Sequence, residues 1–275
     1  MSDVNRRVLP GFGLSLGYAT LYMSLLVLIP LSACFIKASG LGAGEFLAAV
    51  WTESARAAYG LTIGASLAAA LINLPFGLLV AWVLVRYRFP GSRLFDAIID
   101  LPFALPTAVA GLVYSGLYVK SGWLGQYLVP LGIQGAYSRL AIVLVLTFIG
   151  LPFVVRTVQP ILQEFEAEVE EAASCLGATR LQTFRRVIFP TLLPAVVTGF
   201  ALAFARGIGE YGSVVFVSGN MPYRTEIAPV LIVASLEAFQ YRQAAAIAVV
   251  LLLMSFSLLV AINLLERWTK RHGSY

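Results

Sequence analysis

The chain has 275 residues, of which 59% are hydrophobic and only 12% are charged, so it is far more apolar than an average soluble protein. This composition excludes a disordered chain, and the presence of only two cysteines and one histidine excludes a disulfide framework and a Cys/His zinc site. The net charge of +5 is scattered between apolar runs, which is typical of loops that flank a membrane and argues against a nucleic-acid partner.

Long uncharged stretches predict six transmembrane helices, because a helix needs about 20 mostly apolar residues to cross a bilayer. In chain order they cover approximately residues 14–36, 59–85, 97–119, 140–158, 192–217 and 244–265. Pro75 interrupts the second stretch, and Pro102 and Pro106 interrupt the third. The segment 121–138 is also uncharged, but its glycines and its proline predict a loop or a short surface helix. The predicted fold is therefore an all-α membrane protein, with residues 1–275 forming a single transmembrane domain.

Lysine and arginine residues predict the orientation of these helices, because cytoplasmic loops carry the excess of positive charge. One set of helix ends carries twelve such residues: Arg6, Arg7, Arg86, Arg88, Arg93, Arg156, Arg180, Arg185, Arg186, Arg267, Lys270 and Arg271. The opposite set carries six: Lys37, Arg56, Lys120, Arg139, Arg224 and Arg242. The bias predicts that both termini are cytoplasmic, which agrees with an even number of spans.

The longest predicted cytoplasmic connection, residues 159–191, has the composition of a folded element. Five glutamates are followed by a basic cluster: Glu164, Glu166, Glu168, Glu170 and Glu171, then Arg180, Arg185 and Arg186. This order suits helix dipoles. Gly177 can end one helix and turn the chain into the next, and Pro190 is expected to stop the second helix. The pattern favours a two-helix docking element for a soluble partner over a solvated helix pair without one.

The loop also contains a spaced motif, which is Glu171-Ala172-Ala173, three residues, Gly177, nine residues and Val187-Ile188-Phe189-Pro190. This motif resembles the EAA loop of ABC importer permeases, whose pattern has isoleucine and leucine in place of Val187 and Phe189. The resemblance implies a type I ABC importer transmembrane domain whose loop fits against a separate ATP-hydrolysing subunit. The implied contact residues are Glu171, Ala172, Ala173, Gly177, Ala178 and Pro190.

Three further stretches resemble the T-type (U-type) permease subunit of bacterial sulfate/thiosulfate ABC importers. They are LPFALPTAVAG (101–111), GLPFVVRTVQP (150–160) and FARGIGEYGSVVF (204–216), and Asn220 and Pro222 follow the last. The resemblance implies a multi-pass protein of the bacterial cytoplasmic (inner) membrane that transports sulfate and thiosulfate. It also implies three kinds of protein partner: ABC ATPase subunits, a second and non-identical W-type permease, and an external sulfate-binding protein. Permeases for molybdate, tungstate or another oxyanion share parts of these motifs and remain the alternative.

The chain is not predicted to be an enzyme, because it contains no Gly-Lys pair and therefore no phosphate-binding P-loop. No cofactor is expected on this chain, and ATP and magnesium are expected on the partner ATPase. A stand-alone secondary transporter with helices broken at Pro75, Pro102, Pro106 and Pro152 is the alternative of a different class. That alternative gives the loop at residues 159–191 no role.

Two charges, Arg206 and Glu210, fall inside the fifth predicted span and lie on one helix face because they are four residues apart. A charge near the bilayer centre costs at least about 2.5–3.5 kcal/mol and normally faces protein or water. The two residues are expected to neutralise each other, since a carboxylate beside an anion path would repel the substrate. Direct contact of Arg206 with the translocated anion is the alternative.

Overall fold

The computed structural model describes the backbone of residues 11–272 and the side chains of residues 11–264, and this part of the chain is helical without any strand. The elements are α1 (Phe12–Met23), the π turn η1 (Ser24–Leu28), α2 (Ile29–Ser39), α3 (Ala43–Val50), α4 (Glu53–Arg86), α5 (Ser92–Ile99), α6 (Leu101–Ala104), α7 (Thr107–Tyr118), α8 (Gly125–Leu128), η2 (Val129–Leu131), α9 (Arg139–Glu164), α10 (Ala167–Cys175), α11 (Arg180–Thr183), the π turn η3 (Phe184–Ile188), α12 (Phe189–Ile208), α13 (Val214–Val217), α14 (Ala228–Glu237) and α15 (Tyr241–His272). Five basic residues used to predict the orientation lie outside the described side chains: Arg6, Arg7, Arg267, Lys270 and Arg271.

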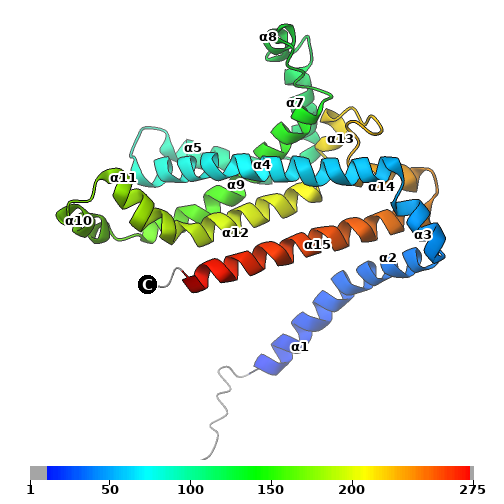
Figure 1. Cartoon of the computed structure of the whole chain (residues 1–275), viewed down its shortest axis with the longest axis horizontal. Helices are drawn as coiled ribbons and strands as arrows, with labels where there is room; N and C mark the ends of the chain where they lie inside the picture. The colour runs from blue at the N-terminus through cyan, green and yellow to red at the C-terminus, as the bar shows by residue number, and fades with distance from the viewer. Residues whose placement is uncertain (1–10, 273–275) are drawn as a thin grey trace, which may run out of the picture.

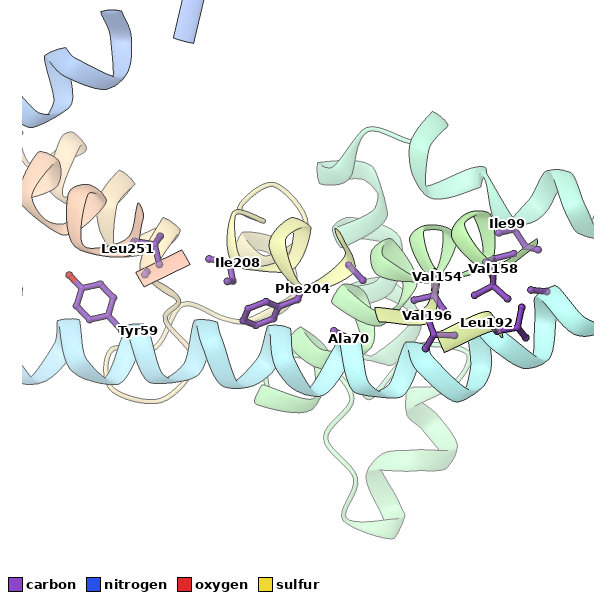
Figure 2. Packing of buried hydrophobic residues seen from close by; sticks show 14 of the residues in the cluster. Tyr59, Ala70, Ile99, Val154, Val158, Leu192, Val196, Phe204, Ile208 and Leu251 are labelled. Atoms are coloured by element: carbon purple, nitrogen blue, oxygen red, sulfur yellow. The ribbon is translucent and has the colours of Figure 1, made fainter. Parts of the chain in front are cut away.

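The core is a bundle of α4, α9 and α12, which pack against one another along most of their length (Figure 1). Figure 2 shows its side chains, which are mainly branched aliphatic residues and alanines from all three helices. Val154 and Val158 of α9 and Leu192 of α12 are completely buried there. Burial on this scale requires the helices to lie close together.

Two glycines permit that close approach, and both lie against Val154 of α9. A Cβ added to Gly77 of α4 would lie 2.6 Å from Cγ1 of Val154, and a Cβ added to Gly199 of α12 would lie 2.8 Å from its Cα. Small residues at such crossings are typical of membrane helices, whose association depends on van der Waals contact. Glycine at these positions therefore sets the spacing of the three-helix core.

Helix α15 packs along α12. It also contacts α2, α3 and α14. Thr62 of α4 fastens α14 to the core, because its Oγ1 accepts a hydrogen bond of 2.8 Å from the buried backbone N–H of Ala228. Helix α1 runs away from the bundle (Figure 1), and α1 and η1 bury none of their residues.

Five helical segments of the described chain are long and apolar enough to cross a membrane: Phe12–Ser39, Glu53–Arg86, Arg139–Glu164, Arg180–Ile208 and Tyr241–Leu264. They correspond to five of the six predicted spans, so the protein is an all-α, multi-pass membrane protein. Pro75 and Pro152 lie inside continuous helices, contrary to the broken helices considered from the sequence.

The third predicted span, at residues 97–119, is wrong as a single helix. Pro102 lies in the first turn of α6, and Leu105 is extended at ψ 133° because the proline that follows it disfavours the helical conformation. The segment is consequently divided into α5, α6 and the apolar α7, which projects from the bundle with α8 (Figure 1). Helix α14, a second short apolar helix, was not predicted at all.

Candidate coupling loop and intramembrane charge pair

The loop that carries the EAA-like motif forms helix α10 and a sharp turn at Gly177. Gly177 has a φ of +80°, in the left-handed region that glycine adopts most easily. The N–H of Ala178 donates to the carbonyl of Ala173 at 3.1 Å, and the N–H of Gly177 donates to that of Ser174 at 2.9 Å. This is the hydrogen-bond pattern of a Schellman motif. The structure therefore places the predicted helix end at Gly177.

The predicted stop at Pro190 is wrong. A continuous helical segment runs from Arg180 to Ile208, and Pro190 lies in the first turn of its α12 part. The π turn η3 comes directly before α12, and the wider turn accommodates a residue that lacks an N–H and crowds the carbonyl four positions earlier. Helix α11, η3 and α12 thus form one continuous helical segment of 29 residues.

Helix α10 stands clear of the bundle and buries none of its residues (Figure 1). Among the motif residues, Glu171, Ala172, Gly177 and Pro190 are exposed, and Ala173 and Ala178 are partly buried. Two large apolar side chains in the same loop are also exposed to solvent, Leu176 to 89% and Leu181 to 65%. This arrangement leaves an apolar, glutamate-flanked surface free for contact with another protein.

Two groups of charged residues near this end of the bundle were not recognised from the sequence. Arg86, the last residue of α4, forms an ion pair with Glu170 of α10. Arg156 of α9 donates to Asp96 of α5 at 2.7 Å and to both carboxylate oxygens of Asp100 at 2.7 and 2.9 Å, which fastens the end of α5 to α9. Only the four-residue spacing of Asp96 and Asp100 could have indicated a shared partner.

The electrostatics of Asp96 follow from this network. Burial alone would raise the pKa of Asp96, but hydrogen bonds from Arg156 and Gln159 and the charge of Arg156 hold that pKa below its usual value. A carboxyl whose pKa is lowered in the folded state contributes stability above its usual pKa and loses it as the pH falls through the lowered value. The network is therefore complete at neutral pH.

The structure brings Arg206 and Glu210 together at the far end of α12. Nη1 of Arg206 lies 2.7 Å from Oε2 of Glu210, whose side chain is 2% exposed, whereas that of Arg206 is 38% exposed. The other carboxylate oxygen of Glu210 accepts hydrogen bonds of 3.0 Å from both the backbone N–H and the hydroxyl of Ser213. The carboxylate is thus the buried member of the pair, with Oε2 in the ion pair and Oε1 hydrogen-bonded by Ser213.

Helix α12 connects the two sites physically. The loop at residues 159–191 leads into the helical segment Arg180–Ile208, and Arg206 lies near the C-terminal end of that segment. No break in the helix separates the loop from Arg206, whereas Glu210 lies two residues beyond the end of α12. Within residues 11–264, the acidic, cysteine and histidine side chains form no group suited to a metal ion.

The described chain is an all-helical membrane protein with an exposed helical loop and a buried carboxylate in an ion pair. Residues 73–271 match the family described as binding-protein-dependent transport system inner membrane component, and the chain belongs to this family. The stand-alone secondary transporter considered from the sequence is therefore ruled out.

Several relatives share nearly the whole chain. The sulfate transport system permease protein CysT of Synechocystis sp. is 50% identical over 254 residues, which is 92% of this chain and 89% of that one. The CysT proteins of Salmonella typhimurium and Escherichia coli are 48% and 46% identical over 262 residues, which is 95% of this chain and 95% of each relative.

Solved structures show the same fold at low identity. A bacterial ABC transporter that imports the acidic polysaccharide alginate superposes with a TM-score of 0.75 at 17% identity, over 92% of this chain and 95% of that one. The MetNI methionine ABC transporter in an inward-facing conformation gives 0.56 at 17% identity, over 83% and 99%. The fold is thus that of ABC importer transmembrane subunits.

Proposed function

We propose that the chain is the T-type permease subunit of an ATP-driven ABC importer for sulfate, with thiosulfate as a second substrate. The observation that carries this proposal is the near-full-length similarity to sulfate transport permeases, at 46–50% identity. Energy is required for such import, because an interior-negative potential opposes a dianion by about 4.6 kcal/mol per 100 mV, twice the value for one charge.

Coupling is proposed to run through residues 159–191, which would dock on a separate ATPase subunit. Three features support this role. The side chains of Leu176 and Leu181 are exposed, α10 buries none of its residues, and the helix is unbroken from Arg180 into α12. The expected contact residues are Glu171, Ala172, Ala173, Gly177, Ala178 and Pro190. ATP and magnesium would then bind to the ATPase subunit, and this chain would hold no cofactor.

Two further protein partners are proposed, a non-identical W-type permease and an external sulfate-binding protein. The family description itself refers to a binding protein, and the alginate transporter has been solved together with its periplasmic protein. The projecting α7 and α8 and the unpacked α1 leave apolar surfaces that either lipid or the second permease would cover.

The proposed topology has six crossings and both termini in the cytoplasm of a bacterial cell, with residues 1–275 forming one transmembrane domain. Five crossings are long helices, and the broken segment at residues 97–119 would provide the sixth. The excess of lysine and arginine at one set of helix ends supports the orientation, and it puts the coupling loop on the cytoplasmic side.

This topology predicts opposite labelling of two exposed cysteines by a membrane-impermeant thiol reagent. In intact cells a cysteine introduced by Ser121→Cys into a chain with Cys34→Ser and Cys175→Ser should react, because Ser121 is exposed on the predicted outer side. The exposed native Cys175, in a Cys34→Ser chain, should react only after the cells are opened. Labelling of Cys175 in intact cells would contradict the topology, as would cleavage of a terminal tag by external protease.

The proposed substrate predicts the phenotype of cells that lack this chain. High-affinity uptake of radiolabelled sulfate should be lost and should return when the gene is restored, and excess thiosulfate should compete with the restored uptake. Normal sulfate uptake combined with failure to accumulate molybdate would show that the oxyanion has been assigned wrongly.

A further inference from the structure

Helix α10 has one charged contact with the rest of the molecule, and Arg86 provides it. Nη2 of Arg86 donates to Oε1 of Glu170, with the two side chains 24% and 31% exposed. Of the five glutamates between residues 164 and 171, Glu170 alone is partly buried. Within the described residues this is the single ion pair that joins the loop at residues 159–191 to another part of the chain.

The guanidinium of Arg86 also lies close to two aromatic rings. Its Cζ lies 5.2 Å from the ring centroid of Trp82 on α4 and 6.0 Å from that of Phe165, which precedes α10. Trp82 in turn contacts the ring of Phe184 edge-on at 5.6 Å, and Phe184 opens the π turn that leads into α12. Phe165, which contacts Arg86, and Phe184, which contacts Trp82, both belong to the loop at residues 159–191 and lie on either side of α10 in the sequence.

The ion pair between Arg86 and Glu170 is suited to fixing the orientation of α10, and it contributes little to the free energy of unfolding. A partly exposed ion pair is typically worth at most about 1 kcal/mol. An arginine stacked on aromatic rings nevertheless presents its planar donors in a fixed orientation, which lysine cannot do. Because α10 buries no residue of its own, its angle to the bundle depends on the two chain connections and on this pair.

We infer that Arg86 is a positioning residue that clamps the coupling helix to α4. The inference rests on the proposed coupling role of the loop and adds a second route for the movement of α10. One route is covalent, through α11 and η3 into α12. The other passes through Glu170 and Arg86 into α4, so that two of the three core helices follow α10 together. Without this ion pair, α10 rotates relative to α4 while the ATPase subunit stays docked. Less sulfate is then transported for each ATP hydrolysed.

The test measures sulfate uptake per ATP hydrolysed by the complete transporter in proteoliposomes. Arg86→Gln and Glu170→Gln are each expected to lower this ratio by about fivefold or more, the lower end of typical coupling between sites. Arg88→Gln is the matched control, because the native side chain is close to Arg86 in the sequence, exposed and unpaired in the described chain. Arg86→Lys, which keeps the charge but loses the stacked planar donors, should fall between wild type and Arg86→Gln.

A double variant separates a shared contact from two independent effects. Arg86→Gln combined with Glu170→Gln should lose no more coupling than either single change, because both remove the same interaction. Additive losses, or unchanged coupling in both single variants, would overturn the clamp. Glu170→Gln lies on an exposed helix and so decides the question even if an Arg86 variant fails to assemble. If Gly177→Val uncouples while the Arg86 and Glu170 variants stay coupled, the clamp is wrong and the coupling role stands. Normal coupling in Gly177→Val would overturn the coupling role and the clamp with it.

Discussion

Replacing Gly177 with valine should leave the transporter inserted and assembled but lower the sulfate uptake that accompanies each ATP hydrolysed. The φ of +80° at this position is strained for any L side chain, by about 1–2 kcal/mol, and more for a β-branched one. A cost of that size changes the population of the native turn by about five- to thirtyfold. A steric clash does not contribute, because a Cβ at Gly177 would have no heavy atom of another residue within 4 Å. The measurement is the ratio of uptake to ATP hydrolysis in proteoliposomes.

Two matched variants separate backbone strain from other effects at Gly177. Gly177→Asn should keep most of the coupling, because asparagine tolerates the left-handed conformation better than other non-glycine residues. Gly132→Val applies the same strain elsewhere, since Gly132 also has a φ of +80° and open space around it but lies between η2 and α9. Gly132→Val should remain coupled. Equal coupling in Gly177→Val and wild type, at equal expression, would count against the loop as the site of coupling.

Removing the charge of Arg206 alone should reduce the yield of assembled transporter more than removing both charges of the pair. Glu210 is the buried partner, and leaving a buried acceptor without its donor costs about 1–3 kcal/mol. The two hydrogen bonds from Ser213 remain and moderate this loss. Arg206→Gln together with Glu210→Gln avoids the unpaired charge, so part of the yield should return. The yield is measured in detergent by size-exclusion chromatography.

The single change Glu210→Gln is the informative comparison, because the two partners are unequally buried. It leaves Arg206, which is 38% exposed, and should therefore cost less yield than Arg206→Gln. Uptake per assembled complex decides between the two roles considered for Arg206. If Arg206→Gln assembles normally but loses uptake, and the double variant does not recover it, Arg206 belongs to the anion path and the ion-pair interpretation is wrong.

The sequence predicted those features that depend on local composition. Four predicted spans became continuous helices, the fifth is continuous only as far as Ile208, and the turn at Gly177 lies where the end of a helix was expected. The broken third span was missed because the two prolines at residues 102 and 106 act together there, whereas Pro75 and Pro152 each lie singly within a long continuous helix. The apolar content was the same in both situations, so composition could not distinguish them.

Features that depend on distant contacts could not be predicted in the same way. Pro190 was expected to end a helix, yet the helical segment from Arg180 to Ile208 continues through a π turn that comes directly before α12. The pairing of Arg86 with Glu170 joins residues 84 positions apart, and nothing in either local pattern singles out the partner. The pairing of Arg206 with Glu210 was foreseen from their four-residue spacing, although Glu210 lies just beyond the end of α12 and not on the same helix face.

The isolation of α1 has a consequence for how the chain is made. Residues 12–28 bury none of their side chains, and the most apolar part of the segment Phe12–Ser39 is not buried at all. Insertion of residues 12–28 is therefore driven by partition into lipid, whereas the α4, α9 and α12 core also needs helices to associate within the bilayer. Membrane integration and tertiary assembly are thus separate stages here, and a thermal melting curve of the purified subunit reports only on the second.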